Sequence, residues 1–278
     1  MAPTDEHQVL FAGGVYELHG MLYPHQEKGA PGIVICHPLF EERKSAHRAL
    51  VEAARAFCSA GFSVLRFDYR GCGNSHGTFR DFGLDDWAKD IRAAAGFLAT
   101  QGGCPRIGLM GLRLGASLAF SAASSAGATF VVGWEPVIDG TSYFQQELRK
   151  KLMKQMMTYG ENQDSRAALA DAADRGEDID FDGYALSPRL YRELTALDLR
   201  KTAHHAGLPV LLSAVTHNAK PSAILAEWTD LLRESSDNVD VHGFRLPPFW
   251  NLVGLTDCSE LIAETITWLQ KQKNPSTS

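Results

Sequence analysis

The sequence predicts an α/β protein whose mostly parallel central sheet has helices on both faces and a helical cap inserted late in the chain. Short apolar runs alternate with longer helical patterns, and strands joined by helices in this way form parallel βαβ units. The runs are apolar throughout, as at 32–36, which is typical of a sheet covered on both faces. Residues 137–198 interrupt this alternation with a charged, helical pattern. We therefore expect a core of residues 1–136 and 199–278, with 137–198 as a cap over the strand ends, where ligands bind in such sheets.

Each core element follows from a local pattern. Gly13-Gly14 separates two runs as the turn of an antiparallel pair would. The first half of the core is expected to contain strands at 8–13, 15–23 and 32–36, a helix at 45–60, a strand at 62–68 and a helix at 84–100. The second half adds a strand at 107–110, a helix at 114–123 and strands at 130–134, 210–215 and 239–246, the last two followed by helices at 222–234 and 259–272.

Charge and hydropathy exclude several classes of partner. The net charge of -6 gives no reason to expect nucleic acid or an anionic membrane surface. No apolar run approaches the roughly 20 residues of a membrane span. The first residues, MAPTDEHQ, lack the basic and apolar regions of a signal peptide. We expect a cytoplasmic protein.

The cysteines predict neither a disulfide framework nor a zinc site. There are five, an odd number, and no two have the C-x-x-C spacing. They are Cys36, Cys58, Cys72, Cys104 and Cys258. We expect no metal and no cofactor.

The segment 106–117, "RIGLMGLRLGAS", reads as a buried strand, a glycine-bounded elbow and the start of a helix. A strand that turns abruptly into a helix crowds the flanking positions, so Gly111 and Gly115 are needed there. The central residue, Arg113, is then lifted to a pocket floor at a helix N-terminus, where backbone N–H groups and the helix dipole favour anions.

Three motifs together resemble the α/β-hydrolase superfamily. Cys36-His37-Pro38 resembles its His-Gly oxyanion loop, and 67–75, "FDYRGCGNS", resembles the D-x-R-G-x-G-x-S loop of serine-aminopeptidase-like and esterase-like members. "GLRLGAS" resembles the nucleophile elbow. The resemblance covers about residues 8 to 270 and implies the α/β-hydrolase fold. The pair "HPLFEERKSAHR" and "GLRLGA" is most similar to exosortase-system-associated hydrolase-like proteins, which similarly carry arginine at the elbow.

The positions of the catalytic triad depart from the family pattern together. Arg113 stands where the resemblance places the nucleophilic serine, and a protonated guanidinium has no lone pair with which to attack. No histidine lies in 246–251, after the last core strand, and no carboxylate lies in 216–220, after the preceding strand. A serine nucleophile needs both a base and an orienting acid. We expect that the serine-hydrolase mechanism is not in use.

Arg113 is the expected anchor of an anion-binding pocket, because its fork geometry matches a carboxylate or a phosphate. The segment 134–140, "WEPVIDG", delivers Glu135 and Asp139 to the same rim. Either could pair with Arg113 and make a structural ion pair instead, since an unpaired buried arginine is very costly. The expected ligand contacts are Arg113, His37, Glu135, Asp139, Leu112, Phe249 and Trp250.

Two neighbouring features each have two interpretations. His37 braces the oxyanion region through hydrogen bonds, or it takes part in catalysis. The charge run 41–44, "EERK", is a solvated helix face, or it sends one member into the pocket.

Three functions are compatible with these residues. The first is a protein with a degenerate triad that binds a small anionic or acyl molecule under the cap. The second is a hydrolase of ester or acyl bonds, in which His37 with Glu135 activates water and Arg113 stabilises the oxyanion. The third is a module that binds a protein partner in an exopolysaccharide or protein-sorting system, which follows from the family resemblance alone.

Overall fold

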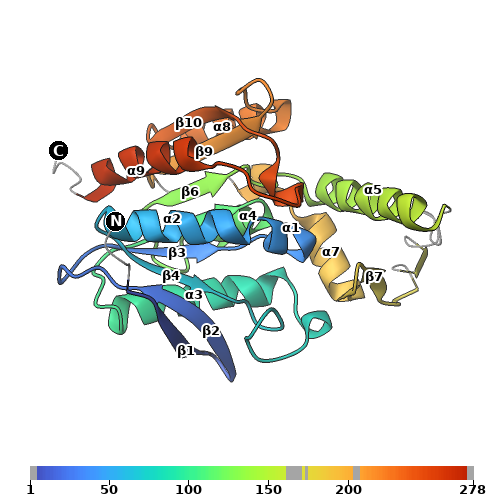
Figure 1. Ribbon diagram of the computed structural model, residues 1–278, viewed down its shortest axis with the longest axis horizontal. Coiled ribbons are helices and arrows are strands. Elements are labelled where there is room, and N and C mark those ends of the chain that lie inside the picture. Colours follow the sequence, from blue (N-terminus) through green and yellow to red (C-terminus); the bar gives the residue numbers. More distant parts are fainter. Residues whose placement is uncertain (1–4, 161–170, 173–174, 203–206, 274–278) are drawn as a thin grey trace.

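An eight-stranded sheet forms the centre of the computed structural model, which describes residues 5–160, 171–172, 175–202 and 207–273 (Figure 1). The strand order is β1-β2-β4-β3-β5-β6-β9-β10. The strands span His7–Gly13 (β1), Tyr16–Tyr23 (β2), Gly32–Cys36 (β3), Ser63–Phe67 (β4), Ile107–Leu112 (β5), Val131–Trp134 (β6), Val210–Thr216 (β9) and Val239–Arg245 (β10). All eight were predicted.

The sheet is antiparallel at one edge and parallel elsewhere, as expected. β1 pairs with β2, and β2 with β4, in antiparallel register, while β4-β3-β5-β6-β9-β10 are parallel. The carboxyl ends of β3, β5, β6 and β9 therefore meet at one edge.

Helices cover both faces because successive side chains of each strand point to opposite sides. On β3, Ile33 and Ile35 pack into one apolar cluster and Val34 into another. The first cluster includes side chains of helices α2 and α9, and the second includes side chains of α3, α4 and α8. These helices span His47–Ser59 (α2), Leu84–Thr100 (α3), Leu114–Ala122 (α4), Ala223–Ser235 (α8) and Ser259–Lys273 (α9).

A short helix that was not predicted precedes one that was. The helix expected at 45–60 is α2, and helix α1 (Phe40–Ser45) comes directly before it. Ala46 lies between them, where its N–H donates to the Glu42 carbonyl and its carbonyl accepts from the Leu50 N–H. The break lets α1 turn across the strand ends, which places the charge run 41–44 beside the elbow.

The insertion, residues 137–198, contains a hairpin as well as helices. Helices α5 (Gly140–Tyr159) and α7 (Pro188–Ala196) flank two antiparallel strands, β7 (Ile179–Phe181) and β8 (Tyr184–Leu186). The expectation of a purely helical insertion therefore fails at 179–186. Asp182 and Gly183 explain the difference, because both adopt positive φ (53° and 88°) and Asp-Gly is a strong hairpin-turn signal.

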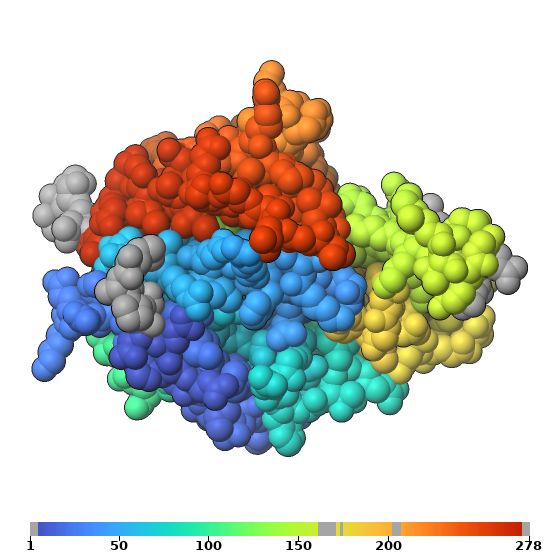
Figure 2. All heavy atoms as spheres, viewed as in Figure 1, coloured from blue at the N-terminus to red at the C-terminus, as the bar shows by residue number. Residues whose placement is uncertain are grey.

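The insertion projects from one end of the molecule, where α5 extends beyond the core (Figures 1 and 2). Its base is joined to the chain after β10, because the Lys150 Nζ donates to the Asn251 Oδ1 over 2.7 Å. In the described part of the chain, every helix falls short of the length and apolar character that crossing a bilayer requires.

Candidate functional site

The elbow has the strained backbone that its glycines predict. Arg113 links β5 to α4 with φ 54° and ψ -126°, a backbone conformation that residues other than glycine rarely adopt. A Cβ at Gly111 would lie 2.4 Å from the Ala116 backbone nitrogen, and one at Gly115 would lie 2.3 Å from the Cys36 carbonyl oxygen. Both neighbours are backbone atoms, so neither glycine position has room for a larger residue.

The loops on both sides of the elbow are strained as well. Phe40, after β3, has φ 52°, and Glu135, after β6, has φ 43°. With Arg113, these residues follow three strands that are adjacent in the sheet. Such strain persists only where the surrounding structure enforces it, and it clusters at functional sites.

The Arg113 side chain is enclosed, with 11% of its surface exposed. Its Nε donates to the Glu42 Oε1 over 3.3 Å, and one Nη donates to the Glu135 carbonyl over 3.3 Å. Its guanidinium carbon lies 5.6 Å from the Tyr143 ring centre and 5.1 Å from that of Trp250. These contacts satisfy the cation with an acid, a carbonyl and two aromatic faces.

Glu42, on α1, is the acid that balances Arg113. Its side chain is 1% exposed, and its second oxygen accepts from the Tyr143 hydroxyl over 3.1 Å. The Lys150 Nζ lies 3.5 Å from its first oxygen. The ion pair expected at this position therefore exists, but the charge run 41–44 supplies the carboxylate.

Neither of the two acids predicted to pair with Arg113 does so through its carboxylate. The Glu135 carboxylate accepts from the Val215 N–H over 2.7 Å. Burial raises the pKa of Glu135, against the opposing effects of that hydrogen bond and of Arg113. Asp139 caps α5 by accepting from the Ser142 N–H over 2.6 Å, and it pairs with Arg200. Asp139 is therefore engaged in holding the insertion.

The His37 side chain contacts Pro38 and Tyr69. Its Nδ1 lies 2.7 Å from the Pro38 carbonyl oxygen, and its ring packs against Tyr69 at a centroid distance of 4.4 Å. Its Nε2 is buried without a hydrogen-bond partner among the described residues. Burial, and then the charge of Arg43, lower the pKa of His37 to about 4, so the ring is neutral at pH 7.

Of the apolar residues that were expected to line the pocket, Leu112 lies in the core and Trp250 lies at the site. Leu112 is fully buried in the apolar cluster that contains α2 and lines none of the described cavities. Phe249 and Trp250 form a short 3₁₀ turn after β10, and their rings lie 5.1 Å apart. Trp250 faces Arg113, as expected for a side chain that fills the space of the missing histidine.

A cavity of about 260 Å³ lies beside this network, between α1, α5, the hairpin and the turn after β10. We call it the insertion cavity. Phe40, Phe181, Trp250 and Val253 supply its apolar lining. Its polar lining includes Glu41, Glu42, Glu147, Lys150, Lys151, Lys154 and Asp182.

Glu147 links the insertion cavity to the buried pair. It bonds Lys150 and is 6% exposed. Burial, and then the negative charge of Glu42, raise the pKa of Glu147 to about 7. This carboxyl therefore titrates near neutral pH, which is unusual for a glutamate.

The insertion also carries an exposed apolar stretch. Met153, Met156, Met157 and Tyr159 on α5 are 48% to 82% exposed. Such a stretch is what a protein partner would cover, but no contact identifies one, so the interaction function stays a prediction. Within the described residues, no cluster of three or more histidine, cysteine or acidic side chains is arranged to hold a metal ion.

Sequence reasoning missed the central role of Glu42, together with Tyr143, Glu147 and Lys150. The signal for Glu42 is its spacing, because Leu39, Glu42 and Ala46 recur at helical intervals and all three are buried. The three residues of α5 give no comparable signal, since their contact with α1 depends on how the insertion folds back.

Solved structures with the same architecture are esterases and hydrolases. Est1E from Butyrivibrio proteoclasticus, solved with ferulic acid, aligns over 95% of this chain and 98% of its own, with a TM-score of 0.68 and 16% identity. This chain has the α/β-hydrolase fold. XC6422 from Xanthomonas campestris, described as an α/β serine hydrolase without a lid, covers 100% of this chain and 99% of its own, with a TM-score of 0.59 and 18% identity.

A third similar structure, DcsB in complex with its substrate analogue, covers 96% of this chain and 99% of its own, with a TM-score of 0.67 and 15% identity. In sequence, the chain is 34% identical to the mitochondrial palmitoyl-protein thioesterase ABHD10 of Bos taurus over 127 residues, 45% of this chain and 39% of the relative. Two uncharacterised Mycobacterium tuberculosis proteins match at 36% over 105 residues, 35% of their length. The chain thus matches under half of each curated relative. No protein-family model matches the sequence.

Proposed function

We propose that this chain binds a small ligand on the α/β-hydrolase fold and does not use a serine nucleophile. Arg113 occupies the elbow, and its side chain is held by Glu42, Tyr143 and Trp250. Trp250 and Phe249 fill the segment after the last strand, in which the sequence has no histidine. Neither a nucleophile nor a base therefore stands where the serine mechanism needs them.

The ligand class is a small acyl carboxylate, bound in the insertion cavity. The observation that carries this proposal is the composition of that cavity, where four apolar side chains lie beside three lysines and four acids, and Lys150 and Lys154 pair with Glu147 and Asp182 of the same lining. An aliphatic chain would contact Phe40, Phe181 and Trp250, and its carboxylate would meet Lys150 or Lys154. The volume of about 260 Å³ lies just below the usual range for ligand sites, which suits a small molecule.

Arg113 acts indirectly in this proposal. Its cation balances Glu42, which lines the insertion cavity, so the pair fixes the cavity floor and the lysines meet the ligand. The sequence-based proposal placed the anchor at Arg113 itself. Because the guanidinium is enclosed, we assign the role of anchor to Lys150 or Lys154 of α5 instead.

The hydrolytic alternative has less support from the geometry. His37 packs on Tyr69, the Glu135 carboxylate bonds the Val215 N–H, and Arg113 bonds Glu42. The three backbones lie near one another, but each side chain is engaged with a different partner. A water-activating constellation would need those side chains to converge.

Reactivity tests the absence of serine chemistry. A fluorophosphonate probe should leave the protein unlabelled, and a panel of p-nitrophenyl esters should not be turned over. Arg113→Ser should stay inactive, because the segment after the last strand, 246–251, has no histidine to act as the base. Esterase activity of the wild type that disappears in His37→Ala would instead support the hydrolytic alternative.

Calorimetric titration with octanoate tests the ligand class. Lys154→Met should weaken binding about two- to fivefold, the effect of one solvent-exposed charge. Lys89→Met is the matched control, because both lysines are similarly exposed (61% and 56%) and each pairs with an acid, but Lys89 and its partner Asp86 lie outside the insertion cavity. Equal affinities for both variants, or no binding to the wild type, would contradict the proposal.

A further inference from the structure

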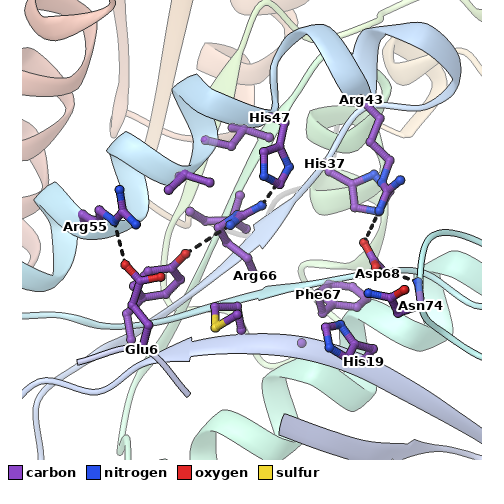
Figure 3. A pocket seen from close by; sticks show the side chains of 16 residues that line it. Glu6, His19, His37, Arg43, His47, Arg55, Arg66, Phe67, Asp68 and Asn74 are labelled. Carbon is purple, nitrogen blue, oxygen red and sulfur yellow. Dashed lines mark hydrogen bonds and ion pairs between the residues drawn. The ribbon is translucent and has the colours of Figure 1, made fainter. Parts of the chain in front are cut away.

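A second cavity, of about 390 Å³, lies between α2 and strands β2 and β4, and His37 is one of its lining residues (Figure 3). Its walls carry an unusual density of cationic and imidazole side chains. Those side chains are Arg43, Arg55, Arg66, His19, His37 and His47. We call it the arginine–histidine cavity.

Its charges do not balance. Arg43 pairs with Asp68, and Arg55 pairs with Glu6 over 2.6 Å. Arg66, on β4, has no carboxylate partner among the residues that the structure describes. Three arginines and two acids leave one positive charge without a counter-charge. The buried His37 is neutral and does not change this sum.

Arg66 keeps most of its hydrogen-bonding capacity. One Nη donates to the Tyr23 hydroxyl over 3.1 Å, and the other lies 3.3 Å from the His47 Nδ1. Figure 3 shows its guanidinium next to His47, with the paired arginines on either side. A guanidinium has five N–H donors, so it can still form a two-pronged contact with a planar carboxylate.

His37 adds a hydrogen-bond acceptor to the same cavity. It is 7% exposed and lines the cavity. Because its Nδ1–H donates to the Pro38 carbonyl, the neutral ring has its lone pair on Nε2, which has no partner in the described structure. A buried acceptor without a partner is costly, and a ligand hydroxyl would satisfy it.

We propose that the arginine–histidine cavity binds a small hydroxylated carboxylate, of the sugar-acid class. The carboxylate bonds Arg66 and supplies the missing negative charge. Hydroxyl groups donate to the His37 Nε2 and contact Asn74 and Asp68, which line the same cavity. The volume fits a molecule the size of one sugar ring. This site is separate from the insertion cavity, and no residue lines both.

Calorimetric titration with four probes tests the chemistry. Glucuronate should bind, whereas glucose, which lacks the carboxylate, and acetate, which lacks the hydroxyls, should bind at least about tenfold more weakly. Equal binding of glucose and glucuronate would overturn the role of Arg66. Preference for glucose 1-phosphate over glucuronate would overturn the carboxylate assignment.

Variants locate the site. Arg66→Gln should weaken glucuronate binding about tenfold or more, and Arg92→Gln, an exposed arginine on α3 outside the cavity, should leave it unchanged. Asn74→Asp adds an acid at an exposed position of the cavity and should also weaken binding, which keeps the test valid if Arg66→Gln does not fold. Octanoate affinity should not change in any of the three, so the two proposals fail independently. Glucuronate binding that survives both cavity variants would refute this one.

Discussion

The buried pair of Arg113 and Glu42 joins two residues that lie far apart in the sequence. Both side chains are largely shielded from bulk water, since they are 11% and 1% exposed. In such a setting the cost of removing one partner exceeds the gain from the pair, because the remaining charge stays buried. The pair therefore ties α1 to the elbow.

We expect Glu42→Gln to lower the free energy of unfolding by about 3 kcal/mol, because it leaves Arg113 without its counter-charge. Glu41→Gln, one residue away in the same helix, should change it by less than about 0.5 kcal/mol, as is usual at exposed positions. Urea unfolding of both variants measures the difference. Adding Arg113→Met to Glu42→Gln should recover most of the loss. Similar midpoints for Glu41→Gln and Glu42→Gln would mean that the pair is not structurally important.

Glu147 should make stability depend on pH. Its pKa is raised from 4.5 to about 7 by burial and by Glu42, so the folded protein holds more protons than the unfolded chain between these values. This contribution is complete below pH 4.5 and is lost as the pH rises through 7. Glu147→Gln should remove this decline in stability with pH. At pH 8 its free energy of unfolding should exceed that of the wild type by on the order of 3 kcal/mol. Urea unfolding from pH 5 to 8 tests this, with the exposed Glu260→Gln as control. A decline that persists in Glu147→Gln would assign it to other groups.

The element that fixes the site is the turn from β5 into α4. Gly111 and Gly115 let the strand, the helix and the loop after β3 approach within backbone contact. The turn therefore depends on its glycines, and its backbone does not require a particular side chain at the centre. This explains how arginine occupies a position shaped for a small nucleophile.

We expect Gly115→Ala to destabilise the protein by more than about 2 kcal/mol, because its Cβ would meet the Cys36 carbonyl at 2.3 Å and backbone cannot rotate away. Gly96→Ala is the matched control. Gly96 lies in α3, and a methyl group added there would have no neighbour within 4 Å, so the change should stabilise the helix by about 0.5–1 kcal/mol. Thermal unfolding of both variants should shift in opposite directions. A tolerated Gly115→Ala would show that the loop after β3 can move.

The sequence predicts elements better than it predicts contacts between them. Helix α3 was expected at 84–100 and is found there, because its amphipathic pattern is local. The short helix α1 before α2 was missed, because six residues carry too little periodicity to be separated from the start of the helix expected at 45–60. The elbow could be located from two glycines. The partner of Arg113 could not, because Glu42 reaches it only through a loop in which Phe40 adopts a strained conformation.

Considered as a whole, the molecule has one large sheet core and a smaller insertion attached at one end. β3 and β5 lie at the centre of the sheet, and every residue of both is buried. The hairpin of β7 and β8 has two short strands and packs mainly through aromatic contacts such as Phe181 with Phe40. Stability is therefore distributed unevenly along the chain.

Hydrogen exchange should reveal this difference. Backbone amides of β3 and β5 should exchange only on global unfolding, and those of β7 and β8 should exchange at least about tenfold faster. Mass spectrometry of exchanged peptides measures both. If a ligand occupies the insertion cavity, protection of the hairpin should increase while the central strands stay unchanged. Equal protection of hairpin and central strands would show that the insertion unfolds only with the core.

The mutual dependence of residues 42 and 113 also restricts the routes by which such a chain changes over generations. Serine at 113 alone would leave the Glu42 carboxylate buried without Arg113. A neutral residue at 42 alone would leave the Arg113 cation buried without Glu42. Replacing Arg113 by serine must therefore either pass through a less stable variant or change residues 42 and 113 together. A change from arginine to serine at the elbow is in this way opposed by packing in the interior.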